Sequence, residues 1–297
     1  MKRLMALFLA VCMALSVSAL ALADGTGTEN KGYLVLGEDL TSQELETVLS
    51  FLQVDDMDDY VVSYTTNEQE HEAFDSYLSA SVVGSRALSS ILLVPGEEGD
   101  GISVTSYNIT YCTVEMYQNA LISAGVEDVA IYIAAPYAVS GTCALVSAMN
   151  AYSTLTGEEI SEASADAAVD ELVTTGELGD AIGSNDTAAE LIALLKQQLL
   201  EQDLTEEELS EAIDNACEEM DVTIDDDLKQ QIIDLLLKLK ETDIDVDALS
   251  KQASNLYSKI SETMDSMGIT RESALNFFQK ALQFVQNLLG NLFGSGE

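Results

Sequence analysis

The pattern of apolar residues changes near residue 157, and this change limits the folds open to the chain more than any other feature. Between residues 32 and 156, short apolar runs alternate with longer segments whose apolar residues recur every three or four positions. Such alternation indicates strands and helices in turn, packed as an α/β domain. After residue 157 only the helical spacing remains. The sequence therefore predicts an α/β domain over 32–156, followed by an all-helical domain over 157–297.

Within the first region, YLVLG (33–37) and YVVSYTT (60–66) are rich in valine and tyrosine, as strands are. LTSQELETVLSFLQ lies between them and has helical spacing, with Thr41 or Ser42 as the capping residue. NEQEHEAFDSYL predicts a second helix. SSILLV and ISVTSYNIT, joined by PGEEGDG, predict the two strands of a β-hairpin. We expect a mixed sheet.

The rest of this region predicts a helix, a strand and a helix. VEMYQNALISAGV ends at Gly125, as a helix with a glycine C-terminal cap does. VAIYIAAP (129–136) is an apolar strand, and GTCALVSAMNAY has the spacing of a buried helix. Pro136 and the polar residues after it interrupt this apolar stretch, so it does not predict a transmembrane helix.

The second region shows a series of amphipathic stripes. Gly176 is expected to end the first helix, and Thr205 with Glu208 forms a capping box ahead of the third. Short connections between such stripes favour a bundle or a helical arm. The stripes are Ala165, Ala168, Val169, Leu172, Val173; Ala188, Leu191, Ile192, Leu195, Leu199; Leu209, Ala212, Ile213, Ala216, Met220; Leu228, Ile232, Leu235, Leu236, Leu239; and two more within 246–292.

The N-terminus has the layout of a secretory signal peptide. Lys2 and Arg3 precede an uncharged apolar stretch, and Ala21-Leu22-Ala23 forms a small-residue cleavage site. We expect residues 1–23 to be removed after Ala23 and residues 24–31 to form a short linker. The mature chain is then secreted or associated with the cell envelope, without a transmembrane segment.

The charge excludes some classes of partner. Cleavage removes two positive charges and takes the net charge from −40 to −42. Nucleic acids are bound through lysine and arginine, so we expect no nucleic-acid partner. Anionic membrane surfaces are disfavoured for the same reason. Weak association with divalent cations is expected from the acidic surface.

Metal and cofactor motifs are absent from the sequence. Cys112, Cys143 and Cys217 form no C-x-x-C pair, and His71 is the single histidine. The segment DIDVD (243–247) resembles the start of a calcium loop but lacks the required glycine and the bidentate glutamate. We therefore predict no metal site and no cofactor. A disulfide between Cys112 and Cys143 is the one pairing considered, and the sequence leaves it open.

The segment AAPYAVSGTCAL contains the most informative polar residues. Ser140 is not in a G-x-S-x-G elbow, and a catalytic triad would have to use His71, which lies in an acidic helix. Capping of the following helix by Ser140 is the favoured interpretation. The alternative is an anion site made by Ser140, Gly141 and Thr142 at a helix start. Asn108 and Thr110 complete the candidate ligand-binding residues.

Several longer segments resemble a known family. SRALSSILL, ISVTSYNIT, MYQNALISAGVEDVAIYIAAPYAVSGTCALV and ELVTTGELG are similar to the YpuA-like family of secreted proteins of unknown function, found mainly in Gram-positive bacteria. The resemblance spans roughly residues 33–260. It implies an exported protein, and it supplies no catalytic residues because none are established for the family.

These features favour a non-enzymatic binding or interaction module at the cell envelope. Its expected partner is an envelope protein or a small anion. The alternative is an envelope hydrolase that relies on carboxylates alone, since an acid-rich chain brings some carboxylates into pairs. The sequence identifies no catalytic residues for such an enzyme.

Overall fold

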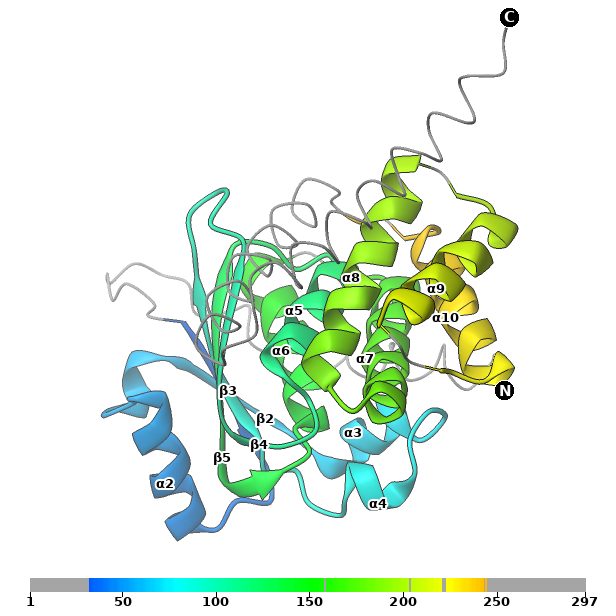
Figure 1. Cartoon of the computed structure of the whole chain (residues 1–297). Helices are drawn as coiled ribbons and strands as arrows, with labels where there is room; N and C mark the ends of the chain where they lie inside the picture. The colour runs from blue at the N-terminus through cyan, green and yellow to red at the C-terminus, as the bar shows by residue number, and fades with distance from the viewer. Residues whose placement is uncertain (1–31, 158, 203, 221–222, 243, 245–297) are drawn as a thin grey trace, which may run out of the picture. The chain divides into compact units, whose positions relative to one another are not determined.

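The computed structural model describes residues 32–157, 159–202, 204–220, 223–242 and 244. The chain divides into two compact units after Val173. The predicted signal peptide, the linker, the calcium-loop-like segment apart from Ile244, and the stripes within 246–292 lie outside the described residues. Figure 1 shows the helices and strands with the labels used below.

A five-stranded mixed sheet forms the centre of the first unit. Its strands lie in the order β2-β1-β3-β5-β4. β3 is antiparallel to both β1 and β5, whereas β2 is parallel to β1 and β4 is parallel to β5. The predicted α/β fold with a mixed sheet is therefore confirmed. The strands are β1 (Tyr33–Gly37), β2 (Val61–Thr65), β3 (Ser90–Pro95), β4 (Ile102–Ile109) and β5 (Val129–Val139).

The predicted hairpin of β3 and β4 is wrong, because β5 lies between these strands. The reason is burial. β5 is apolar and mostly buried from Val129 to Ala135, so it requires a neighbour on each side. β4 alternates exposed and covered residues and tolerates the edge of the sheet. The connection from β4 to β5 passes through helix α5 (Val114–Ser123), as parallel neighbours require.

β5 is also longer than the predicted strand and continues through Pro136 to Val139. The register between β4 and β5 shifts at this point: Tyr107 pairs with Ala134, but Ile109 pairs with Val139. Pro136 therefore lies where no ladder pair is formed. Its missing N–H costs no hydrogen bond at such an irregularity.

Helices cover both faces of the sheet (Figure 1). Helix α2 (Ser42–Leu52) packs on one face, where Val48 and Leu52 meet Leu34, Leu36 and Leu92. Helix α5 packs against β4, and helix α6 (Thr142–Thr156) against β1, β2 and β3, on the other face. Helix α3 (Asn67–Phe74) packs on α6. A short 3-10 helix, η1 (Met57–Asp59), precedes β2, and α4 (Ala80–Val83) follows α3.

The local sequence explains where these helices begin and end. Thr41, one of the two capping residues that the sequence allows, forms a capping box with Glu44 at the start of α2, and Thr66 with Gln69 does the same for α3. α5 is followed by Gly125, whose φ of 80° lies in the left-handed region that favours glycine. The Thr41–Glu44 pair also fixes the Glu44 carboxylate beside Arg86, as described below.

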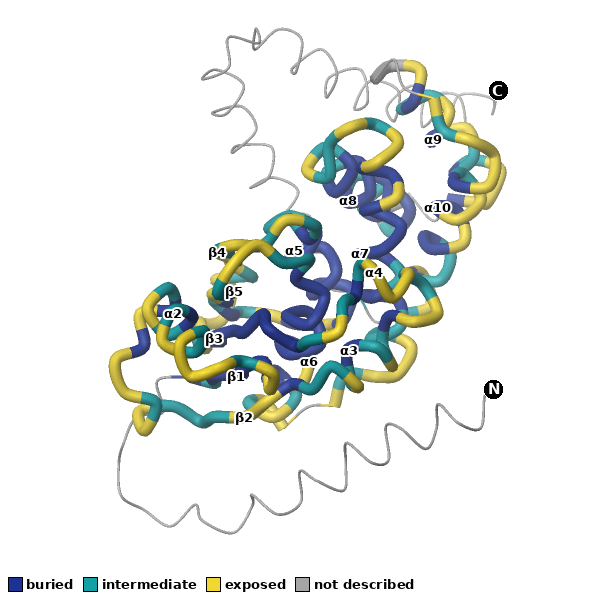
Figure 2. Tube along the Cα trace, turned by 90° about the horizontal axis from the view of Figure 1, so that it is seen from below, coloured by how far each residue is buried: buried dark blue, intermediate teal, exposed yellow. Residues whose placement is uncertain are grey.

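The second unit contains the end of α7 (Glu162–Ile182) together with α8 (Asn185–Gln202), α9 (Glu206–Met220) and α10 (Asp226–Leu239). α8, α9 and α10 pack against one another. Where burial is described, their predicted apolar stripes are buried apart from Ala216, which is partly buried, and Figure 2 marks buried positions in dark blue. The expected helix end at Gly176 is wrong, because α7 continues to Ile182. A glycine inside a helix costs only about 1 kcal/mol, which helix packing offsets.

The expected boundary at residue 157 coincides with the end of α6, where Gly157 has a φ of 73°. The compact units, by contrast, divide within α7. None of the described helices combines the length and the apolar character needed to cross a membrane.

Candidate functional site

The candidate site lies where β4 and β5 end and α6 begins. Because β1, β2, β4 and β5 run in the same direction, their carboxyl ends lie at one end of the sheet, where α/β proteins bind ligands most often. The five predicted ligand-binding residues all belong to this end. Asn108 and Thr110 lie at the end of β4, and Ser140, Gly141 and Thr142 lead from β5 into α6.

Asn108 and Thr110 connect the end of β4 to the backbone of β5. The side-chain amide of Asn108, a residue with a φ of 60°, donates to the carbonyl of Ala135 over 2.9 Å. The Thr110 hydroxyl and its backbone N–H both donate to the carbonyl of Val139, over 2.8 and 2.9 Å. The polar groups of these residues therefore bind the backbone of β5.

The turn before α6 is fixed by backbone contacts. The carbonyl of Ser140 accepts hydrogen bonds from the N–H groups of Tyr111 and Cys112. The carbonyl of Gly141 accepts one from the hydroxyl of Tyr117, over 2.6 Å. Gly141 has a φ of 97°, and a Cβ on it would lie 2.3 Å from that hydroxyl oxygen. Only glycine fits here, because both the backbone conformation and the neighbouring tyrosine exclude a side chain.

The prediction that Ser140 caps α6 is wrong. Gly141 is the N-cap residue, so the cap position supplies no side-chain hydrogen bond to the helix. The Ser140 hydroxyl instead lies 3.2 Å from the hydroxyl of Thr142. The helix starts one residue later than expected because the left-handed Gly141, and not Ser140, makes the final turn into it.

A buried carboxylate from α3 binds the first turn of α6 in place of a cap. Glu70 is only 2% exposed, and its carboxylate accepts a hydrogen bond of 2.6 Å from the Thr142 hydroxyl. The side-chain amide of Asn67 donates to its other oxygen over 3.2 Å, and the backbone N–H of Cys143 also binds the carboxylate. A carboxylate at a helix N-terminus satisfies free N–H groups and interacts favourably with the helix dipole. The protein's own glutamate thus binds Thr142, one of the three residues of the predicted anion site.

Burial decides the protonation behaviour of Glu70. Removal from water raises the pKa of its carboxyl group, while the hydrogen bonds from Thr142, Asn67 and the Cys143 N–H oppose that rise. With a raised pKa, this carboxyl group keeps its proton to a higher pH than an ordinary glutamate does. The sequence shows no sign of this role, because Glu70 stands in the acidic run NEQEHE.

His71, the neighbour of Glu70, is bound on both ring nitrogens. Nδ1 lies 2.6 Å from a carboxylate oxygen of Asp75, and Nε2 lies 2.8 Å from the carbonyl of Gly84. The hydrogen bond to Asp75 raises the pKa of the imidazole most, and the hydrogen bond to the Gly84 carbonyl raises it further. His71 connects α3 to the end of α4, and neither ring nitrogen binds the hydroxyl of Ser140. The residues of a serine triad are therefore not brought together.

The cysteines near this site are buried and unpaired with one another. Cys112 and Cys143 are both free thiols, so the disulfide that the sequence left open is not formed. Burial raises the pKa of each thiol to about 12. Thiols with such values are poor nucleophiles and poor metal ligands.

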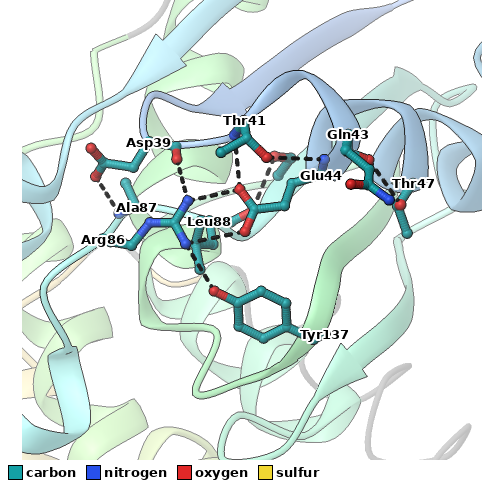
Figure 3. A network of polar contacts seen from close by, with 10 residues as sticks. Asp39, Thr41, Gln43, Glu44, Thr47, Arg86, Ala87, Leu88 and Tyr137 are labelled. Carbon is teal, nitrogen blue, oxygen red and sulfur yellow. Dashed lines mark hydrogen bonds and ion pairs between the residues drawn. The ribbon is translucent and has the colours of Figure 1, made fainter.

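A second polar cluster surrounds Arg86, the single lysine or arginine of residues 32–173. Its guanidinium donates to both carboxylate oxygens of Glu44, over 3.1 and 2.7 Å, and to the carbonyl of Asp39. It also donates to the hydroxyl of Tyr137 (Figure 3). Arg86, followed by Thr41, lowers the pKa of Glu44 to about 2. Arg86 is thus held between α2 and β5, and sequence reasoning missed this cluster because its members are far apart in the chain.

The acidic runs act as helix caps where the structure describes them. Asp56 in DDMDD accepts from the N–H of Asp58, and Asp225 in DDD accepts from the N–H of Leu228. In the described part of the chain, no three histidine, cysteine, aspartate or glutamate residues are grouped so as to hold a metal ion.

Comparison with known proteins assigns relatives but no activity. The family model described as "Protein of unknown function (DUF1002)" matches residues 36–256. A protein of Bacillus subtilis named "Uncharacterized protein YpuA" is 38% identical over 253 residues, which cover 84% of each chain. No solved structure matches.

Proposed function

Because the chain belongs to the DUF1002 family, whose description assigns no function, we propose a function from its site and its charge. The protein is exported and acidic, and it binds a partner at the cell envelope without catalysing a reaction. Export rests on the signal-peptide pattern of residues 1–23. The acidic surface adds weak association with divalent cations.

The single observation that carries this proposal is the position of Glu70. Ligands of α/β proteins bind most often at the carboxyl end of the strands, and here the chain's own carboxylate binds Thr142 and the first turn of α6. This contact favours a protein partner over a small anion, because an anion would have to displace a buried side chain. His71 supports the same conclusion, since both ring nitrogens already have partners within the protein.

A carboxylate-dependent hydrolase is the second candidate, and the raised pKa of Glu70 is the observation that favours it. A general acid must reach the bond that it protonates. Glu70 is 2% exposed and both its oxygens have partners, so a substrate would gain access only after α3 moved away from α6. The binding function requires no such movement.

The test separates binding from hydrolysis on one preparation. The mature chain, residues 24–297, is incubated with isolated envelopes of a Gram-positive bacterium, and the bound protein and released fragments are measured together. We expect saturable binding, no released fragments, and equal binding by Glu70→Gln. Fragments released by the wild type but not by Glu70→Gln would establish the hydrolase. Absence of saturable binding would refute the proposed function.

A further inference from the structure

β2 is an edge strand without the usual protection against pairing. Among the described residues it pairs with β1 alone. Its five residues, VVSYT, include no charge, proline or glycine. Natural edge strands are commonly protected by lysines, prolines or bulges, and an edge that lacks them can accept a further strand.

The other edge strand, β4, differs in this respect. Its pairing becomes irregular between Tyr107 and Ile109, where Asn108 takes a positive φ. The side-chain amide of Gln118 also donates to the carbonyl of Ile102 at its start, over 3.0 Å. A bulge and a bound carbonyl are both devices that discourage strand addition. β2 is therefore the better candidate for an interaction edge.

The side chains of β2 also suit a neighbouring strand. Val62 is partly buried against the core beneath α2, so it anchors the strand. Tyr64 is 59% exposed, more than the other exposed tyrosines, Tyr132 at 40% and Tyr137 at 48%. Tyr137 already accepts a hydrogen bond from the guanidinium of Arg86 through its hydroxyl, whereas the exposed Tyr64 belongs to the edge strand itself. Aromatic residues on an edge strand stabilise an added strand by cross-strand contacts.

The charge beside β2 specifies the chemistry of the added strand. Asp55, Asp56, Asp58 and Asp59 are all exposed and lie immediately before the strand. Arg86, the single lysine or arginine of residues 32–173, is bound to Glu44 and does not offset these acids. An exposed cluster of four carboxylates attracts lysine and arginine at the same end of the paired segment.

We propose that the outer edge of β2 binds an extended segment of a partner protein, an inference that rests on the proposed binding function. The segment runs antiparallel to β2 and carries lysines or arginines just after the paired residues. Antiparallel pairing is the more stable arrangement. It brings the carboxyl end of the partner segment to the start of β2, where the four aspartates lie.

The probe is a synthetic peptide of five alternating threonine and valine residues followed by three lysines. Its binding to the mature chain, residues 24–297, is measured by fluorescence anisotropy, and the control peptide carries the lysines before the threonine and valine residues. We expect saturable binding of the first peptide and weaker binding of the control. Equal binding of both peptides, or no binding, would overturn the proposal.

Matched variants locate the binding surface. Asp55→Asn with Asp58→Asn should weaken binding about fivefold, the effect of losing two exposed ion pairs. Glu97→Gln with Glu98→Gln removes the same charge from an exposed turn at the start of the β3–β4 connection and should leave binding unchanged. Tyr64→Lys should abolish binding, whereas Tyr132→Lys, a tyrosine of the inner strand β5, should reduce it little. Equal effects within either pair would refute the β2 edge, and thermal melting verifies that each variant is folded.

The same variants separate this inference from the proposed function. If the chain binds isolated envelopes but Tyr64→Lys binds them as well as the wild type does, the β2 edge is refuted and envelope binding stands. If the wild type fails to bind envelopes but binds the peptide in the predicted orientation, the envelope function is refuted and the β2 edge stands.

Discussion

The carboxylate of Glu70 in α3 accepts a hydrogen bond of 2.6 Å from the hydroxyl of Thr142 in the first turn of α6. This contact joins two residues that are 72 positions apart in the sequence and lies where the parallel strands end. It explains at once why Ser140 need not cap α6 and why α3 is held against α6.

Glu70→Ala should lower the free energy of unfolding by about 1–3 kcal/mol, because the Thr142 hydroxyl and the Cys143 N–H lose a buried partner. Glu70→Gln keeps the shape and one acceptor oxygen, so it should cost less. Urea unfolding measures both, and Glu68→Ala, an exposed position of the same helix, is the control. A Glu70→Ala protein as stable as Glu68→Ala would show that the contact does not stabilise the fold.

The raised pKa of Glu70 predicts a dependence of stability on pH. The folded protein holds this proton more tightly than the unfolded chain, so the contribution is fully present below the ordinary value of 4.5 and is lost as pH rises through the folded value. The stability of the wild type relative to Glu70→Gln should therefore decrease as pH rises from 4 through neutrality. Chemical unfolding of both proteins across this range measures the difference. A difference that stays constant, or that increases with pH, would contradict the assignment.

Gly141→Ala should destabilise the protein by about 3 kcal/mol or more. The new Cβ would lie 2.3 Å from the Tyr117 hydroxyl oxygen and 2.5 Å from Cγ2 of Ile109, at a φ of 97°. Gly157→Ala is the matched control, since Gly157 has a φ of 73° with no atom within 4 Å of the added Cβ, and should cost about 1 kcal/mol. Thermal melting compares the two. Equal losses would show that the packing against Tyr117 is not tight.

Cys112 and Cys143 should resist alkylation in the folded protein. Both thiols are buried, and burial raises the pKa of each to about 12, so little thiolate is present at pH 8. Iodoacetamide should label both thiols only after the protein is denatured, and no reductant should be needed. Mass spectrometry of the resulting peptides measures the labelling. A peptide pair linked by a disulfide, or rapid labelling of the native chain, would contradict this prediction.

How far the sequence predicts this fold depends on whether the deciding contacts are local. The capping box at Thr205, the choice of Thr41 or Ser42 as the cap of α2, the helix end at Gly125 and the strand-forming runs arise from neighbouring residues, and these predictions are confirmed. Strand order is decided by pairing between distant segments. The insertion of β5 between β3 and β4 therefore contradicts the hairpin that the PGEEGDG turn favours.

The candidate site shows the same division. The sequence places Ser140, Gly141 and Thr142 at a helix start, and the structure brings Asn108 and Thr110 to the same end of the sheet. Glu70 could not be identified, because nothing in NEQEHE distinguishes the one carboxylate that is buried against a helix 72 residues later. The pairing of Arg86 with Glu44 is hidden for the same reason, with 42 residues between them.

If Glu70 fills the position that a ligand anion would otherwise take, a small carboxylate should replace its missing side chain, and chemical rescue tests this most directly. The melting temperatures of wild type, Glu70→Ala and Glu68→Ala are measured with increasing acetate or formate, at ionic strength held constant with chloride. A small carboxylate that binds in place of the missing side chain stabilises the folded state by mass action. We predict that acetate or formate raises the melting temperature of Glu70→Ala alone. Equal stabilisation of the wild type would contradict the account, because an anion site would then remain open beside Glu70.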